Sequence, residues 1–399
     1  MRKILFGVFG CLVAVCAHAA QVANLDYVHK LIQQKWDISI PIKADNPMLA
    51  ANMKYLLTAV DVANEILNGE KTTDYGNGEF ATLHTADTVA TIQAVDTLVK
   101  KIDKGPKFTL TTTPDTSGFS FSISAAGKFY VDWGDGTIET ISKPDTTNTI
   151  YSHSYDTANT YTIGIGGQAT AYNTDPYTAA ISFVDGIYLE FDSTWQIASI
   201  DGSLGAIFRT LPDATEKQPR FYQTFLGAYY MEGSIPANLF AGISGAPAGS
   251  MFSQTFSGCS GLTGAIPDGL FGNLTGAPAD SMFSDTFSGC SGLTGAIPNG
   301  LFAGISGAPA EYMFNRTFYG CNKLTSIPEN LFGNISGTAQ NRMFYRTFYN
   351  CTSLTGPSAR INGQYLYEIW SSATSDQVGD MYYKATGLSD YSNIPSEWK

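Results

Sequence analysis

The chain is poor in the residues that carry most enzyme chemistry. Of its 399 residues, only 15% are charged, four are His and six are Cys. Beyond residue 19 the histidines are His29, His84 and His153, and none belongs to a metalloprotease, nucleophile-elbow or phosphate-loop motif. We therefore expect no catalytic site, no cofactor and no metal centre. Paired carboxylates that cleave a glycan remain the enzyme alternative.

The chain also lacks a long hydrophobic run after its first residues. No later stretch approaches the roughly 20 apolar residues that a membrane-spanning helix needs, so we expect no transmembrane segment in the mature chain. The formal net charge is −12. Nucleic acids and anionic lipids repel a chain this acidic, so we predict that neither is a partner and that polyanions in general are disfavoured.

The N-terminus has the order of a secretory signal. Arg2 and Lys3 precede an apolar stretch that ends at the small-residue sequence Ala17-His18-Ala19. We assign residues 1–19 to a signal peptide and expect an exported protein that is secreted, periplasmic or held at the cell surface. Lipidation at Cys16 is the alternative, although Val15 is larger than the residue such a site prefers.

Residues 20–107 carry a helical pattern. Six apolar residues between Leu49 and Leu67 follow alternating spacings of four and three, and a shorter stripe runs from Ile92 to Ile102. Loop residues between the stripes predict a helical hairpin. The hairpin is either a self-contained pair or a stalk through which the chain forms a homo-oligomer.

Residues 108–191 change to a period of two, which is typical of strands. Phe119 to Ile123 and Phe129 to Trp133 alternate, and Gly134-Asp135-Gly136-Thr137 then predicts a tight turn. Together with His153-Ser-Tyr155, these motifs resemble the polycystic-kidney-disease (PKD) family of β-sandwich modules. Asp132, Asp135 and Asp145 suggest calcium, but we interpret them as turn residues and His153 as the partner of the turn.

The strongest pattern is an internal repeat of about 31 residues within 192–370. A unit begins with Met-Phe and continues through Thr-Phe, Cys and Leu, and the three complete units then add Ile-Pro and Leu-Phe. An earlier, looser unit has Ala228 in place of Cys. The Met-Phe pairs start at Met251, Met282, Met313 and Met343. The eight apolar anchors of a unit supply about 2 kcal/mol each, whereas ordering its backbone costs some 30–60 kcal/mol. One unit cannot fold alone, so we expect the units to stack.

The order of these anchors resembles bacterial BspA-type leucine-rich repeats, although Ile-Pro stands where many such repeats have a Leu-rich strand. The resemblance implies a leucine-rich-repeat-like solenoid over 192–370 with an apolar cap at 371–399. It also implies surface or secreted proteins that act in adhesion. The fold class we predict is multidomain α+β, with the helical hairpin, the PKD-like β-sandwich and this solenoid.

Four cysteines recur at one position of the repeat, namely Cys259, Cys290, Cys321 and Cys351. Stacked units would align them at about one strand spacing. A buried ladder of thiols is the first interpretation, because Cys often fills small apolar positions. Disulfides between neighbours and a metal site are the alternatives.

The repeats differ from one another mainly at their polar positions, which packing does not explain. Two serines of the early units become Tyr319 and Tyr349, while Gln254 and Asp285 become Arg316 and Arg346. Tyr345 lies beside Arg346. Because Arg and Tyr are enriched at binding hot spots, we predict a ligand-binding face formed by Arg316, Tyr319, Tyr345, Arg346 and Tyr349. A solvent-exposed face that has drifted in sequence is the alternative.

The sequence as a whole therefore favours a non-catalytic adhesion or binding protein outside the cytoplasm, with a protein or a glycan as its ligand. A self-assembling structural protein of the cell envelope is the second hypothesis, and a glycan-processing enzyme is the third.

Overall fold

The computed structural model describes residues 107–399 except 185–192, 213, 215 and 272. The chain divides into two compact units, Met1–Gly105 and Pro106–Lys399, and the second contains all described residues. The predicted signal peptide, and the predicted helical hairpin up to residue 106, lie outside the described part. Within that part, no helix is both long and apolar enough to cross a lipid bilayer.

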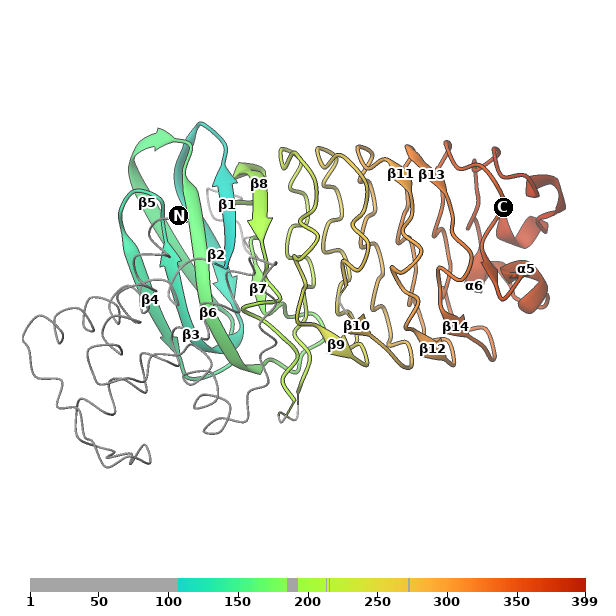
Figure 1. Ribbon diagram of the computed structural model, residues 1–399, viewed down its shortest axis with the longest axis horizontal. Helices are drawn as coiled ribbons and strands as arrows, with labels where there is room; N and C mark the ends of the chain where they lie inside the picture. Colours follow the sequence, from blue (N-terminus) through green and yellow to red (C-terminus); the bar gives the residue numbers. More distant parts are fainter. Residues whose placement is uncertain (1–106, 185–192, 213, 215, 272) are drawn as a thin grey trace, which may run out of the picture. The chain divides into compact units, whose positions relative to one another are not determined.

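The N-terminal part of the described unit, residues 108–202, consists of two antiparallel sheets (Figure 1). The five-stranded sheet has the order β4-β3-β6-β1-β8 and the three-stranded sheet has the order β5-β2-β7. The strands are β1 (Phe108–Thr112), β2 (Thr116–Ile123), β3 (Ala125–Asp132), β4 (Ile138–Lys143), β5 (Thr149–Asn159), β6 (Thr162–Tyr172), β7 (Ile181–Ser182) and β8 (Ile197–Gly202). A short 3₁₀ helix, η1 (Ser193–Gln196), precedes β8.

The two sheets share an aromatic core because alternate side chains of each strand face inward. In β3, Phe129 and Val131 are buried while Lys128 is exposed. The ring centre of Phe121, in the small sheet, lies 5.6 Å from that of Trp133, the residue directly after β3. Gly167 is required where β6 pairs with β3, because a Cβ at this position would lie 2.2 Å from the carbonyl oxygen of Lys128.

The repeats are built mainly from consecutive turns. In the segment 250–259 the backbone N–H of Thr255 donates to the carbonyl of Phe252 at 3.2 Å, and the next N–H, of Phe256, donates to Thr286 of the following repeat at 2.9 Å. This alternation runs through the segment. Every fourth residue adopts the left-handed conformation, with φ of 52° at Ser250, 56° at Gln254 and 79° at Gly258.

Hydrogen bonds and ring stacking join each repeat to the next, and Figure 1 shows the repeats in chain order from yellow-green to red. Corresponding phenylalanines stack along the row at 5.4–5.7 Å, from Phe225 through Phe256, Phe287 and Phe318 to Phe348. The row begins on the sheets, because Phe183 stacks on Phe225 at 5.3 Å. Sheets and repeats therefore share one hydrophobic core.

Regular elements in the repeats are very short. The parallel pairs are β9–β10, β11–β13 and β12–β14, with bounds β9 (Ser244–Gly245), β10 (Asn273–Leu274), β11 (Gly295–Ala296), β12 (Ser306–Gly307), β13 (Leu324–Ser326) and β14 (Asn334–Ile335). The C-terminal part adds β15 (Arg360–Ile361), β16 (Gln364–Tyr365), α5 (Leu366–Ile369), α6 (Ser375–Val378), η2 (Tyr391–Asn393) and η3 (Ser396–Trp398).

The predicted fold class is wrong for the described part. Strands in small separate sheets dominate it, the two α-helices have four residues each, and no closed barrel or leucine-rich-repeat solenoid is formed. Two features of the sequence account for the short strands. Pro follows Ile in the repeats and has no N–H for a strand ladder, and left-handed residues interrupt extended backbone in the turn segments.

Left-handed serines offer a test of this turn structure. Ser281 has φ of 56°, a conformation that costs an L-residue about 1–2 kcal/mol and costs glycine little. We expect Ser281→Gly to raise the free energy of unfolding by about 0.5–1 kcal/mol, measured by denaturant titration. Ser291→Gly, at a position without positive φ, is the matched control and should destabilise. Equal destabilisation by both variants would contradict the turn structure.

Candidate functional site

The structure brings the five predicted ligand-binding residues together. The rings of Tyr319 and Tyr349 stack at 4.8 Å, with an angle of 8° between their planes. The Arg346 guanidinium lies 4.8 Å from the ring centre of Tyr345 and 5.3 Å from that of Tyr349. Arg316 lies 5.8 Å from the ring of Tyr319. Cation–π contacts and the stacking of Tyr319 on Tyr349 therefore link all five side chains.

Four further residues, which the repeat pattern did not predict as part of the site, extend this cluster. Tyr383 stacks on Tyr349 at 4.6 Å, and Lys384 lies 5.5 Å from the ring of Tyr383. Arg342 lies 5.7 Å from the ring of Tyr312 and 5.2 Å from that of Tyr345. We call all nine residues the Arg/Tyr surface.

Repeat alignment contained a signal for two of the missed residues. Tyr312 and Arg342 occupy the position that is Ser250 and Ser281 in earlier repeats, so this position also changes along the row. Tyr383 had no such signal. It follows Tyr349 by 34 residues, outside the regular period, because the chain leaves the repeat pattern in the C-terminal part.

Backbone conformation fixes the arginines of this surface. Arg316 and Arg346 sit at the left-handed position of their turns, with φ of 51° and 56°. Their N–H groups donate to Tyr345 and Gly379 at 2.9 and 3.0 Å. Tyr319 and Tyr349 follow these arginines by three residues in each repeat. The column of arginines and the column of tyrosines, each formed by equivalent positions of neighbouring repeats, therefore lie side by side.

Ionic partners differ between the two central arginines. Arg346 forms a salt bridge with Asp380, with its Nη2 2.9 Å and its Nε 3.0 Å from Oδ2. Arg316 influences Asp285 electrostatically, but the Arg316 Nε is buried without a hydrogen-bond partner. Burial raises the pKa of Asp285, while hydrogen bonding to Ser284 and the charge of Arg316 oppose that rise. In the stack, desolvation and the neighbouring phenols Tyr383 and Tyr319 raise the pKa of Tyr349.

The four repeat cysteines form a buried ladder of free thiols. Each thiol donates to the carbonyl of a phenylalanine in the preceding repeat, for example Cys290 to Phe256 at 3.0 Å and Cys321 to Phe287 at 3.0 Å. Burial raises the pKa of all four thiols, that of Cys321 to about 12. These cysteines therefore act in packing and hydrogen bonding between repeats.

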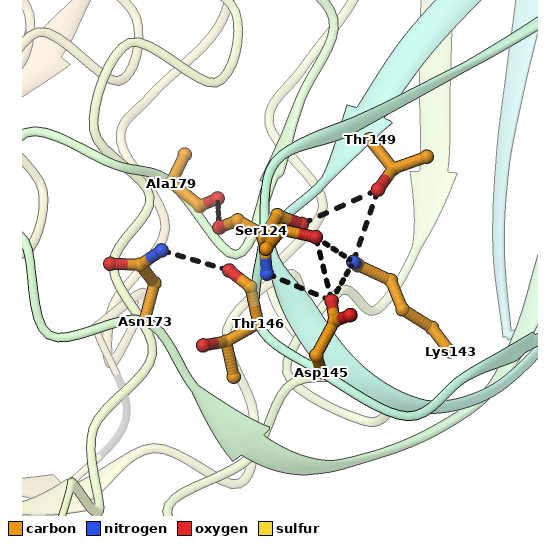
Figure 2. Close-up of polar contacts among 8 residues, drawn as sticks. Ser124, Lys143, Asp145, Thr146, Thr149, Asn173 and Ala179 are labelled. Carbon is orange, nitrogen blue, oxygen red and sulfur yellow. Dashed lines mark hydrogen bonds and ion pairs between the residues drawn. The ribbon is translucent and has the colours of Figure 1, made fainter.

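The aspartates that suggested calcium serve their own turns. Asp132 accepts the N–H of Gly134 at 3.0 Å, and Asp135 accepts that of Thr137 at 2.8 Å. Figure 2 shows Asp145 beside Lys143, whose Nζ donates to Asp145 at 2.9 Å and to Thr149 at 3.1 Å. Among the described residues, no three His, Cys, Asp or Glu side chains group together as a metal site would require.

His153 is placed beside the tight turn. Its Nε2 lies 2.7 Å from Asp135 Oδ2, and its ring stacks on Trp133 with centroids 5.1 Å apart. The turn is further tied to β5 because the Tyr155 hydroxyl donates to the carbonyl of Trp133 at 2.8 Å. These contacts assign His153 a structural place within the described part of the chain.

The turn gives a pH-dependent prediction. The hydrogen bond from His153, followed by that from the Thr137 backbone, lowers the pKa of Asp135 from 3.8 to about 2. A lowered folded-state pKa stabilises the protein above the unfolded value, and this contribution is lost as pH falls from about 4 to about 2. We therefore expect the wild type to have a higher melting temperature than Asp135→Asn at pH 7. The difference between the two melting temperatures should shrink as the pH falls towards 2. A constant difference would contradict the assignment.

Comparison with family models, curated proteins and solved structures finds no match to this chain. The fold and the site define a protein of two antiparallel sheets joined to turn-built repeats that carry an arginine and tyrosine surface. The resemblances to BspA-type repeats and PKD modules therefore rest on the sequence motifs.

Proposed function

We propose that this chain is an exported, non-catalytic binding protein that recognises a protein or a glycan through the Arg/Tyr surface. Export would depend on the signal peptide predicted at residues 1–19, with the mature chain secreted, periplasmic or at the cell surface. The observation that carries the proposal is the continuous contact of four cations and five tyrosines at one end of the repeats.

Residue type and rigidity both support a binding role. Arg and Tyr dominate interface hot spots, since they combine a large contact area with directional hydrogen bonds. Here their backbones are held by turns and by hydrogen bonds to the next repeat. Such a preordered surface loses little conformational entropy on binding.

The test is binding of the full chain to arrays of extracellular proteins and glycans. A variant that replaces Arg316, Tyr319, Arg346 and Tyr349 with alanine should lose saturable binding, with affinity lower by a factor on the order of 100. Gln254→Ala/Ser257→Ala changes the same two columns in an earlier repeat and is the matched control. If the folded protein binds nothing and light scattering finds an oligomer, the structural role replaces this proposal.

A further inference from the structure

We infer that the ligand of the Arg/Tyr surface is an anionic polysaccharide, whose carboxylate or sulfate groups pair with Arg316, Arg342 and Lys384. This inference deepens the proposed function and rests on it. It follows from the distribution of Lys and Arg along the repeats, from cations that have no carboxylate partner, and from the tyrosine ring faces and backbone N–H groups that already make contacts within the protein.

Positive charge is unevenly distributed along the repeats. Residues 221–315 contain no Lys or Arg, although they include Glu232, Asp268, Asp280 and Asp285. Arg316, Arg342, Arg346 and Lys384 then gather on the Arg/Tyr surface. The net charge of −12 disfavours polyanions over the chain as a whole, but these clustered cations form a local positive site at which a negative ligand can bind.

Several polar groups of the surface lack partners within the described part. Arg346 is neutralised by Asp380, but no described carboxylate lies within ion-pair distance of Arg342 or Lys384. The Nε of Arg316 is also without a hydrogen-bond partner. A negative ligand can therefore pair with Arg342 and Lys384 without displacing a described carboxylate.

The stacked tyrosines argue against nucleic acid as the ligand. Tyr349 has Tyr319 on one side at 4.8 Å and Tyr383 on the other at 4.6 Å. Single-stranded nucleic acid binds by stacking its bases on open ring faces. Because both faces of Tyr349 are occupied, the column presents ring edges and hydroxyl groups, which hydrogen bond to sugars or to charged groups.

The backbone argues against a peptide that binds by adding a strand. That mode needs free N–H and C=O groups along an edge. Here the N–H of Arg316 donates to Tyr345, that of Tyr319 donates to Arg316, and that of Gly320 donates to Tyr349. Recognition therefore depends on side chains, and cations spread over neighbouring repeats fit a polymer that carries charge at regular intervals.

Calorimetry with the full chain tests this inference. The probes are polygalacturonate, which carries carboxylates, dextran sulfate, neutral dextran and poly-glutamate. We expect one or both anionic polysaccharides to bind, neutral dextran not to bind, and poly-glutamate to bind at least about tenfold more weakly. Affinity should fall several-fold as salt rises from about 50 to 300 mM, because the Debye length shortens.

Charge variants connect that binding to the surface. Arg342→Ala/Lys384→Ala should weaken binding by at least about tenfold, since the variant loses two charged hydrogen bonds to the ligand. Arg342→Lys/Lys384→Arg should retain most of the affinity. Lys128→Ala/Lys217→Ala removes two exposed charges elsewhere and should bind as wild type. Thermal unfolding checks that each variant is folded.

The outcomes separate this inference from the proposed function. Unchanged binding by Arg342→Ala/Lys384→Ala, or equal binding of neutral dextran or poly-glutamate, overturns the anionic-polysaccharide assignment. If neither anionic probe binds, but an array ligand binds and is lost in the four-alanine variant, the assignment fails and the proposed function stands. If no ligand binds in either experiment, both fail.

Discussion

Replacing Phe287 by alanine should lower the free energy of unfolding by about 3–5 kcal/mol. Phe287 is fully buried and stacks on Phe256 at 5.6 Å and on Phe318 at 5.7 Å. Its removal interrupts the row of stacked phenylalanines in the middle and leaves a cavity. Because backbone hydrogen bonds hold the neighbouring residues in place, they cannot move in to fill it. Urea or guanidinium titration followed by circular dichroism measures the change.

The control is Phe287→Leu, which keeps most of the volume and should cost less than about 1.5 kcal/mol. Since stability in repeats depends on contacts between neighbours, the alanine variant should also lose amide protection in the flanking repeats first. A loss below about 1 kcal/mol for Phe287→Ala would show that the ladder contributes little.

Replacing Asp390 by alanine should destabilise the C-terminal part by about 2–4 kcal/mol. The buried carboxylate accepts the N–H of Ser358 at 2.8 Å, the hydroxyl of Ser358 at 2.6 Å and the hydroxyl of Tyr367 at 3.2 Å. The alanine variant leaves three donors without partners. Hydrogen exchange should locate the loss of protection around residues 356–370 and 380–399.

Asp390→Asn is the matched variant, because its amide oxygen still accepts at least one of these hydrogen bonds. It should lose less stability than Asp390→Ala. The same experiment tests whether these hydrogen bonds keep Tyr383 and Lys384 of the Arg/Tyr surface in place, since both residues belong to the C-terminal segment that contains Asp390. If Asp390→Ala unfolds at the same denaturant concentration as wild type, the three hydrogen bonds do not hold this segment.

Much of the candidate site was predictable from spacing alone. A period of 31 residues that falls to 30 between the last two units places Tyr319 beside Tyr349 and Arg316 beside Arg346 in any stacked arrangement, whatever the backbone between them. The same reasoning aligned the four cysteines, whose thiols donate to carbonyls of the preceding repeat. Residues outside the period, such as Tyr383, could not be placed in this way because no repeat spacing relates them to the stack.

The fold class was predicted less well, for a physical reason. The spacing of apolar residues predicts which residues are buried. It does not show whether the backbone between them forms a strand or a series of turns, because both can bury the same residues. That choice depends on backbone conformation at Ser250, Gln254 and their equivalents, where non-glycine residues take positive φ. Hydrogen bonds between repeats stabilise this conformation, and they exist only once the repeats have stacked.

By itself, the sequence determined the repeat period, the buried anchors and the change from small and acidic groups to arginine and tyrosine along the row. These follow from residue type and spacing. Only the tertiary structure decided which of these cations form ion pairs, because Asp380 reaches Arg346 across 34 residues while Arg342 and Lys384 have no carboxylate partner within the described part. Electrostatic pairing depends on distances of a few ångströms, and these are set by how the C-terminal segment packs on the last repeat.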